Sequence, residues 1–308
     1  MFRSILVPLD GSRFAEAALP IASRLARTAR GKLHLVLAHT PSGAVVGMGE
    51  IPAVFPEADA ELKQRELCYL TETAAGIGSV GGAPVDVRHL DGPAGPEVCE
   101  EASRLGADLV VMATHGRGAI GRLWLGSVAD YVIRHLRIPV LLIRGGRAEE
   151  APAHGLAGGI VVAMDLSPHS EAVLEPVTAM ARLIQSHVTL FHVVEPYYTT
   201  EPGTLSPALQ DPTITGIRRA DAQSALDRIA DRLRLRGLSV SVSVVVGASA
   251  AGALIEALQG DRFGLAAMTT HGAGGLQRLL LGSVADRVIR ASAKPVLVLR
   301  PPDGPEPE

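Results

Sequence analysis

Two segments of this chain, residues 112–130 and 268–286, carry nearly the same sequence. They read MATHGRGAIGRLWLGSVAD and MTTHGAGGLQRLLLGSVAD, with 13 of 19 positions identical at an offset of 156 residues (268 minus 112). Solenoid repeats recur every 20–50 residues or so, roughly a third of this offset or less. An offset of this length instead matches the size of one globular domain. The repeat therefore predicts that the chain folds as two copies of one domain.

The domain boundaries follow from length and composition. A chain of 308 residues fits two domains of about 150 residues, each large enough to bury its own core. We predict a first domain at residues 1–146 and a second at 157–300, joined by a linker at 147–156 in a stretch rich in Gly, Ala and charge. Residues 301–308 contain four prolines and are predicted to be a disordered tail.

The composition excludes several classes of partner. The net charge is −3 and aromatic residues make up 3%, which argues against a nucleic-acid partner, since such proteins carry basic patches and stacking aromatics. No long uncharged apolar stretch and no cleavable leader is found, so we expect a cytoplasmic protein without membrane contact. Cys68 and Cys99 form no Cys-x-x-Cys pair and no His-Glu-x-x-His occurs, so no structural zinc site is predicted.

Strand and helix patterns alternate through the first half. Short apolar runs predict strands at residues 5–9, 32–39, 84–90, 109–113 and 140–143. Helical spacing predicts helices at 14–29, 61–75, 96–105 and 127–135, and a Pro/Gly-rich stretch at 41–56 is predicted to be a long loop. Because the strands are apolar throughout rather than alternating, they indicate a parallel sheet covered on both faces.

The second half repeats this plan. Predicted strands lie at 160–164, 187–194, 239–246, 265–269 and 296–299, with helices at 170–185, 221–236, 250–258 and 283–291 and a long loop at 196–212. The predicted fold class is α/β, with two tandem five-stranded parallel-sheet domains of Rossmann-like architecture. Ligands are expected at the carboxyl ends of the strands.

The repeated segment predicts a phosphate site. In each copy a glycine follows the fourth strand, Gly116 or Gly272, and a Gly-Ser pair ten residues later opens a helix. Unpaired N–H groups and the partial positive charge at a helix N-terminus suit a phosphate, and Ser127 can cap the helix and donate to an anion. The alternative is a plain turn with a serine cap. Repetition of glycines, serine and helix start favours the ligand.

Two familiar nucleotide motifs do not apply. Gly116, Gly118 and Gly121 match the dinucleotide fingerprint literally, but that fingerprint follows the first strand of its fold, and Gln277 replaces the third glycine in the second copy. No Gly-Lys-Ser/Thr occurs anywhere, so the chain lacks a Walker motif.

With these motifs, both halves of the chain resemble a tandem-domain universal stress protein of the ATP-binding type. The sheet of such proteins is similar to that of the adenine-nucleotide alpha hydrolases. Nucleotide-binding members of that family carry Gly-x-x-Gly, nine residues, then Gly-Ser/Thr. This chain matches from Gly116 and Gly272 onward, with Ala113 and Thr269 in place of the leading glycine. Pro8-Leu9-Asp10 and Ala163-Met164-Asp165 match the family's turn after the first strand.

The resemblance implies two ATP sites. In the first domain the implied residues are Pro8, Leu9, Asp10, Ser12, Thr40, Ala113, His115, Gly116, Arg117, Gly118, Gly126, Ser127 and Val128. In the second they are Ala163, Met164, Asp165, Ser167, Val193, Thr269, His271, Gly272, Gly274, Gly282, Ser283 and Val284. The cofactor implied is ATP, with Mg²⁺ as the candidate metal accompanying it. Asp10 and Asp165 would meet ribose hydroxyls or act as helix caps, and the two histidines are expected to brace the loop rather than catalyse.

The two copies are expected to differ. Asp108 begins the fourth strand of the first domain where the second has Gly264, and Arg117 is matched by Ala273. Together with Ala113 in place of the bulkier Thr269, these differences predict tighter binding in the first domain.

The function implied is a nucleotide-dependent stress-response regulator with little or no ATP turnover, since no lysine clamp, no nucleophile–base pair and no acidic metal pair beyond Asp10 and Asp165 is found. The alternative is a stress protein that binds no nucleotide and acts only through other proteins. A nucleotidyl-transferring enzyme of related architecture is disfavoured, because the turn after the first strand reads Asp10-Gly11-Ser12. The apolar fifth strands are expected to pair, within one chain or in a homodimer, since an exposed edge invites aggregation.

Overall fold

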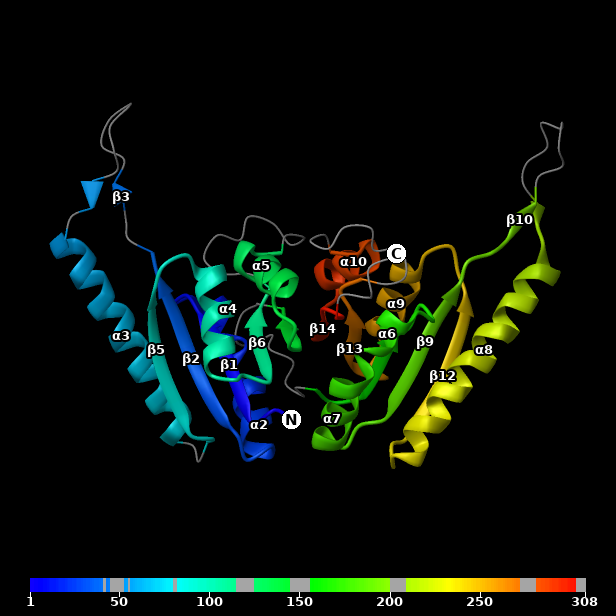
Figure 1. Ribbon diagram of the computed structural model, residues 1–308, viewed down its shortest axis with the longest axis horizontal. Helices are drawn as coiled ribbons and strands as arrows, with labels where there is room; N and C mark the ends of the chain where they lie inside the picture. Colours follow the sequence, from blue (N-terminus) through cyan, green and yellow to red (C-terminus); the bar gives the residue numbers. More distant parts are fainter. Residues whose placement is uncertain are drawn as a thin grey trace. The chain divides into compact units, whose positions relative to one another are not determined.

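The computed structural model describes residues 1–40, 43–44, 53–54, 56–79, 82–114, 125–144, 156–199, 209–271 and 281–302. The chain forms two compact units, Met1–Gly155 and Leu156–Glu308 (Figure 1). Of the predicted linker and the predicted tail, only Leu156, Pro301 and Pro302 are among the described residues.

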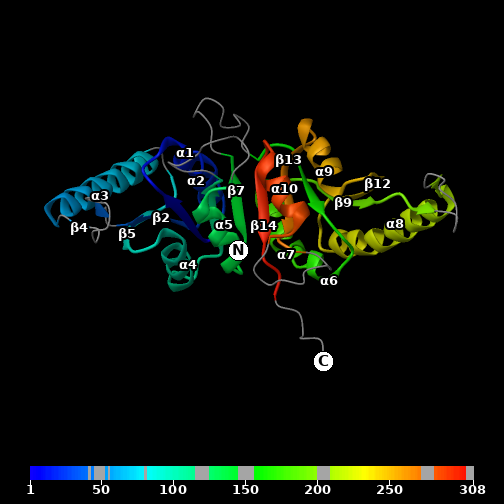
Figure 2. The same cartoon turned by 90° about the horizontal axis from the view of Figure 1, so that it is seen from above.

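The first unit is a five-stranded parallel sheet with helices on both faces. Its strands, in the spatial order β5-β2-β1-β6-β7, are Val85–Asp91, Lys32–His39, Ser4–Leu9, Leu109–Ala113 and Val140–Ile143. The helices are α1 (Arg13–Glu16), α2 (Leu19–Thr28), α3 (Pro56–Ser79), α4 (Ala94–Arg104) and α5 (Ser127–His135). As right-handed crossovers require, α1, α2 and α3 cover one face and α4 and α5 the other (Figure 2).

The second unit has the same topology. Its strands, in the order β12-β9-β8-β13-β14, are Val240–Val246, Val188–Val194, Gly159–Ala163, Phe263–Thr269 and Val296–Leu299. The helices are α6 (Pro168–Glu171), α7 (Leu174–Ile184), α8 (Pro212–Leu235), α9 (Ala250–Gln259) and α10 (Ser283–Ala291). The predicted fold class, two tandem parallel α/β sheets, is confirmed.

The central strands form the core of each unit. Every residue of β6 and of β13 is buried, and in β1 only Ser4 is partly exposed. Apolar side chains on both faces of a strand are what a sheet covered on both sides requires. This pattern explains why the apolar runs located the strands to within one or two residues.

The two predicted long loops contain short antiparallel ladders. In the first unit β3 (Gly43–Ala44) pairs with β4 (Ala53–Val54), and in the second β10 (Tyr198–Thr199) pairs with β11 (Leu209–Gln210). The prediction of loops without secondary structure was therefore wrong at these positions. Two-residue strands are too short to show a periodic pattern.

Several predicted helices have different bounds in the structure. The helix predicted at 14–29 is two helices, α1 and α2, because Pro20 has no N–H to continue the ladder and occupies the first turn of α2. Pro176 separates α6 and α7 in the same way. Helices α3 and α8 begin five and nine residues earlier than predicted, at Pro56 and Pro212 instead of residues 61 and 221.

Among the described residues, none of the helices combines the length and the apolar character needed to span a bilayer.

Candidate functional site

The sheet order places a crevice at the same position in each unit. From β1 the chain moves outward to β2 and β5 on one side, then crosses back to β6 on the other. Ile5 lies opposite Leu109 in the β1–β6 pair, so Leu9 and Ala113 end side by side at the carboxyl edge. In parallel α/β sheets ligands bind outside this edge, where the strand order reverses. The equivalent strands of the second unit are β8 and β13.

The turn after β1 holds an aspartate at this edge. The Ser12 N–H and hydroxyl both donate to Asp10 Oδ1, over 2.9 and 2.6 Å, and Ser12 Oγ accepts from the Ala15 N–H at 3.3 Å. The serine therefore caps α1 while the aspartate side chain closes the turn. The half-buried Asp10 carboxylate is held in one orientation beside the end of β6.

The second unit builds the same turn with a strained residue. Ser167 donates twice to Asp165 Oδ1, at 3.0 and 2.5 Å, and its hydroxyl caps α6 by accepting from the Ser170 N–H. The middle residue is left-handed in both units, with φ +77° at Gly11 and φ +67° at Leu166. Glycine adopts this conformation freely, whereas a leucine is strained in it.

Helix α5 starts next to the end of β6. The Gly126 N–H donates to the Thr114 carbonyl at 2.7 Å. This bond joins the residue just before α5 to the residue just after β6. Gly126 is the N-cap residue, and no side chain of the described residues caps the helix. Ser127, predicted to be the cap, is instead the first helical residue, and its side chain is exposed beside the first-turn N–H groups. The capping role predicted for Ser127 was therefore wrong.

Helix α10 is fixed in the same way, and here the glycine has a structural reason. The Gly282 N–H donates to the Thr270 carbonyl at 2.8 Å, and a Cβ on Gly282 would lie 2.9 Å from that oxygen. The position favours glycine because a side chain there would press against the protein's own main chain. Ser283, like Ser127, is exposed at the first helical position.

Ala113 and Thr269 occupy the position of the family's leading glycine. Ala113 ends β6 and is buried. The Thr269 hydroxyl donates to the His271 carbonyl at 2.9 Å, and the Thr270 hydroxyl lies 3.0 Å from His271 Nδ1. The His271 ring thus contacts the strand end, as a loop-bracing role would require, and the threonine ties down the first residues of its own loop.

Thr40 and Val193, the residues implied for the ATP sites near the end of the second strand of each unit, do not occupy matching positions. Pro8 lies opposite Val36, and the matching Ala163 lies opposite Phe191. Counting along the strands from these pairs, Thr40 matches Glu195, and Val193 matches Ala38. In addition, His192 Nδ1 lies 2.7 Å from the Met164 carbonyl, next to the aspartate turn of the second unit.

The remaining predicted residues divide into three groups. Pro8, Leu9 and Met164 are buried at the ends of β1 and β8, and Ala163, Val128 and Val284 are half-buried. Asp108 accepts from the Arg3 and Ser4 N–H groups at 3.0 and 3.1 Å, at the amino ends of the strands, so it is no part of the phosphate site. Outside the described residues lie His115, Gly116, Arg117, Gly118, Gly272 and Gly274.

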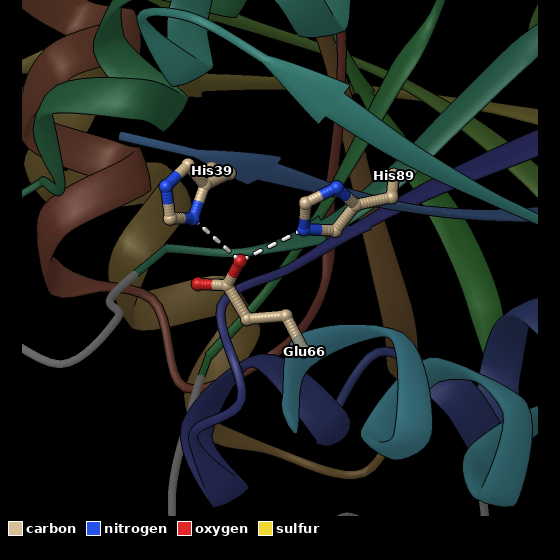
Figure 3. Close-up of side chains that lie close together, drawn as sticks. All are labelled: His39, Glu66 and His89. Atoms are coloured by element: carbon tan, nitrogen blue, oxygen red, sulfur yellow. Dashed lines mark hydrogen bonds and ion pairs between the residues drawn. The ribbon is translucent and has the colours of Figure 1, made fainter. Parts of the chain in front are cut away.

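A polar cluster in the first unit was missed by sequence reasoning. His39 at the end of β2, His89 on β5 and Glu66 on α3 meet between the sheet and the helix (Figure 3). Glu66 Oε2 lies 2.8 Å from His39 Nδ1 and 2.8 Å from His89 Nε2, and Asp59 Oδ1 lies 2.8 Å from His39 Nε2. The one available sequence signal was the polar stripe of α3, in which Asp59, Lys63 and Glu66 lie on the helix face of the buried Leu70.

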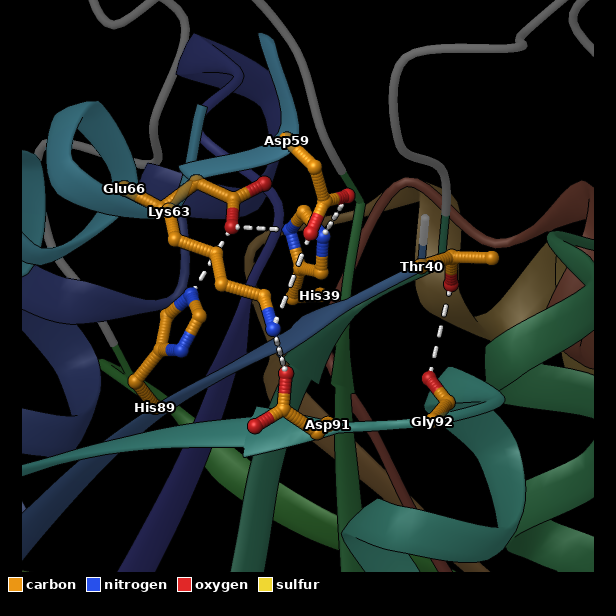
Figure 4. A network of polar contacts seen from close by, with 8 residues as sticks. All are labelled: His39, Thr40, Asp59, Lys63, Glu66, His89, Asp91 and Gly92. Carbon is orange, nitrogen blue, oxygen red and sulfur yellow. Dashed lines mark hydrogen bonds and ion pairs between the residues drawn. The ribbon is translucent and has the colours of Figure 1, made fainter. Parts of the chain in front are cut away.

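The cluster extends outward through a lysine. Lys63 Nζ lies 2.7 Å from Asp91 Oδ1 and 3.8 Å from Asp59 Oδ2 (Figure 4). Burial acts to lower the pKa of His39, but hydrogen bonds to the Asp59 and Glu66 carboxylates outweigh it and raise that pKa above its ordinary value. The His39 side chain has 0% exposure, so the cluster is part of the interior of the unit.

Sequence comparison matches both units to one family. The model of the Universal stress protein family matches residues 1–144 and again residues 158–300. A universal stress protein of Thermus aquaticus is 33% identical over 144 residues, which is 47% of this chain and 100% of that relative. One from Mycolicibacterium smegmatis is 29% identical over 200 residues, or 63% of this chain and 62% of that protein.

Structure comparison matches the fold over nearly the whole chain. A universal stress protein from Archaeoglobus fulgidus aligns with a TM-score of 0.71 at 19% identity, covering 97% of this chain and 99% of the other. A Pseudomonas aeruginosa protein aligns with a TM-score of 0.63 at 18% identity, covering 97% and 93%. At these identities the likeness concerns the fold.

Proposed function

The chain belongs to the universal stress protein family, and from this premise we propose that each unit binds ATP in the crevice between its first and fourth strands. In this proposal the protein is a nucleotide-dependent stress-response regulator that holds ATP with little or no turnover. Mg²⁺ would accompany the phosphates, and no residue of the chain is assigned to it.

The observation that carries the proposal is one arrangement built twice. At the same edge of each sheet, an aspartate–serine turn faces a helix whose N-terminus is bonded to the neighbouring strand end, through Thr114 and Gly126 or Thr270 and Gly282. The first turn of that helix carries N–H groups that no carbonyl of the helix accepts, an exposed serine and the positive end of the helix dipole. These groups suit phosphate oxygens, and the carboxylate suits the hydroxyls of a ribose.

Holding rather than hydrolysing ATP fits the residues present. Neither the segment 113–128 nor the segment 269–284 contains a lysine, so no ammonium is available there to neutralise a leaving phosphate. The groups assigned to phosphate in each site are main-chain N–H groups and a serine hydroxyl, with Arg117 in addition in the first unit, and no general base is assigned beside them.

The test is to denature freshly purified full-length protein, separate the released nucleotides by ion-exchange chromatography, and measure ATP binding of nucleotide-free protein by calorimetry. We expect ATP to be released or to bind, at up to two equivalents per chain. An absence of both would leave the alternative, a stress protein that acts only through other proteins.

The variants Ser127→Ala and Ser283→Ala refine the test. Since neither serine caps its helix, we expect weaker ATP binding with an unfolding midpoint unchanged within error. Ser12→Ala is the contrasting variant, because it removes a helix cap and should lower stability by about 1 kcal/mol.

We further propose that the fifth strands, β7 and β14, mediate pairing. Both are apolar edge strands of their own units, and natural proteins cover such edges. Pairing within one chain predicts a monomeric mass in light scattering, and pairing between chains predicts twice that mass.

A further inference from the structure

His39, Glu66 and His89 bring three metal-ligating atoms to one point inside the first unit. The atoms Nδ1 of His39, Nε2 of His89 and one carboxylate oxygen of Glu66 all lie within 4.8 Å of one another (Figure 3). Separations of this size need only small side-chain movements to reach metal–ligand distances of about 2.0–2.2 Å. We propose that these three side chains form a site for a transition-metal ion, with zinc as the best match.

The hydrogen-bond pattern itself calls for a cation at this place. Both ring nitrogens of His39 face carboxylate oxygens at 2.8 Å, and ionised carboxylates only accept. A neutral imidazole has a single N–H, so the second contact needs a positive charge, supplied either by a proton on His39 or by a metal ion that takes the place of that proton. A metal ion between His39 Nδ1 and Glu66 supplies that charge, and it also satisfies His89 Nε2, which faces the same Glu66 oxygen.

A second shell of side chains is already in place. Asp59 accepts a hydrogen bond from His39 Nε2, which leaves Nδ1 as the ligating atom and holds the ring in position. Lys63 lies between Asp59 and Asp91 and balances their charge (Figure 4). A carboxylate behind a ligating histidine is the usual support of a zinc site. Asp59 would play this part for His39 when Nδ1 binds the metal ion.

The second unit shows that the fold does not need a polar cluster here. The strand register matches His39 with Val194 and His89 with Val244, and the equal lengths of α3 and α8 match Glu66 with Ala222. All three counterparts are buried and apolar. Since apolar packing at this position supports the same fold, and buried charges are often less stabilising than apolar groups, the cluster is not explained by stability.

The donor set selects the kind of ion. Two imidazoles and one carboxylate suit zinc, whereas Mg²⁺ prefers oxygen ligands throughout. Glu66 and His89 each retain 10% exposure of their side chains, which leaves access for a water molecule as the fourth ligand. The site is therefore distinct in chemistry from the Mg²⁺ expected to accompany ATP.

The test uses the full-length, tag-free chain after treatment with a chelator and without added nucleotide. We expect one equivalent of Zn²⁺ to bind in calorimetry, and Co²⁺ to give the visible d–d bands of a four-coordinate site. An absence of thiolate-to-cobalt charge transfer will separate this site from binding at Cys68 or Cys99. Zn²⁺ should also raise the midpoint of thermal unfolding, because it binds only the folded chain.

The decisive variant replaces two ligands with the residues of the second unit, Glu66→Ala with His89→Val. It is expected to fold, to lose the cobalt bands and to show no thermal shift with Zn²⁺. Asp59→Asn keeps all three ligands and should weaken Zn²⁺ binding by about 10- to 100-fold. His187→Gln, which removes a histidine that contacts only Ser239 and Ser241 among the described partners, is the control and should bind like the wild type.

Two results would overturn the proposal: no Zn²⁺ or Co²⁺ binding by the wild type, or binding that persists unchanged in the double variant. Neither result depends on ATP binding, so the metal site and the proposed nucleotide site succeed or fail separately.

Discussion

The middle residue of the aspartate turn differs between the units in a way that affects stability. Gly11 and Leu166 both have positive φ, but only the leucine has a Cβ that crowds its own backbone. Asp165 and Ser167 hold the turn closed around Leu166, so the strain remains in the folded state. Such strain is commonly found where a ligand needs a turn of fixed shape.

Leu166→Gly should stabilise the second unit. The substitution relieves the left-handed strain, and we expect a gain of about 1 kcal/mol in the free energy of unfolding. Urea denaturation measures it, with Gly11→Ala as the reciprocal variant, expected to lose stability. A loss of stability in Leu166→Gly would mean that the partly exposed leucine side chain contributes more than its backbone costs.

His34 makes the first unit sensitive to acid. Burial lowers its pKa below 6.5, an effect to which Lys32 and Arg88 add and which Asp86 and Glu101 oppose. The unfolded chain therefore binds a proton below pH 6.5 more readily than the folded chain does, so stability falls as the pH falls. His34→Leu should show a smaller drop in the urea midpoint between pH 7 and pH 5.5 than the wild type. Parallel pH profiles of the two proteins would contradict this account.

At the scale of elements, the ends of the helices decide where the site residues lie. Within the described part of the chain, main-chain hydrogen bonds from Gly126 and Gly282, rather than capping side chains, hold the starts of α5 and α10. The long helix α8 follows the opposite rule, since Asp211 Oδ1 accepts from the Thr213 and Ile214 N–H groups at 2.9 and 3.1 Å. A cap of this kind satisfies main-chain N–H groups at the start of α8.

Asp211→Ala should destabilise the second unit by about 1 kcal/mol, within a range of about 0.5–2 kcal/mol, because it leaves two N–H groups of α8 without an acceptor. Asp211→Asn keeps the accepting oxygen and should cost much less. Urea denaturation of both variants measures the difference, and equal losses would show that the charge rather than the cap matters.

The sequence predicted the bounds of the buried strands well, because their apolar runs are set by burial. The strands 109–113, 140–143 and 296–299 have the predicted bounds, since apolar runs in a parallel sheet report burial directly. The start of α8 was missed although Asp211-Pro212 is an N-cap followed by a proline at the first helical position. The histidine cluster could not be predicted, because its members come from three segments that only the register and the helix packing bring together.

At the scale of the whole molecule, the two proposed ATP sites share one arrangement of strands and helices but differ in several of the residues around them. Thr269 replaces the smaller Ala113 and bonds to the His271 carbonyl, and His192 lies against Met164 where the first unit has Leu37. Substitution of Gly126 and Gly282 cannot compare the sites, since a Cβ at Gly282 would press on the Thr270 carbonyl. The aspartates offer a cleaner comparison because each accepts the same two hydrogen bonds from the serine two residues later.

Asp10→Asn and Asp165→Asn should therefore remove different fractions of ATP binding. An asparagine oxygen can still accept from the serine, so the turns remain, but the charge offered to the ribose is lost. We expect calorimetry of the wild type to resolve two affinities, with Asp10→Asn weakening the tighter one and Asp165→Asn the weaker. Identical isotherms for the two variants would contradict the predicted inequality of the sites.

The bond between each helix start and its strand end has a consequence for how such proteins diversify. Because Thr114 and Gly126, or Thr270 and Gly282, hold both ends of a segment together, the residues between them can vary without moving the helix that follows. Substitutions within the segment can therefore change which ligand it contacts, while the strand and the helix on either side keep their positions.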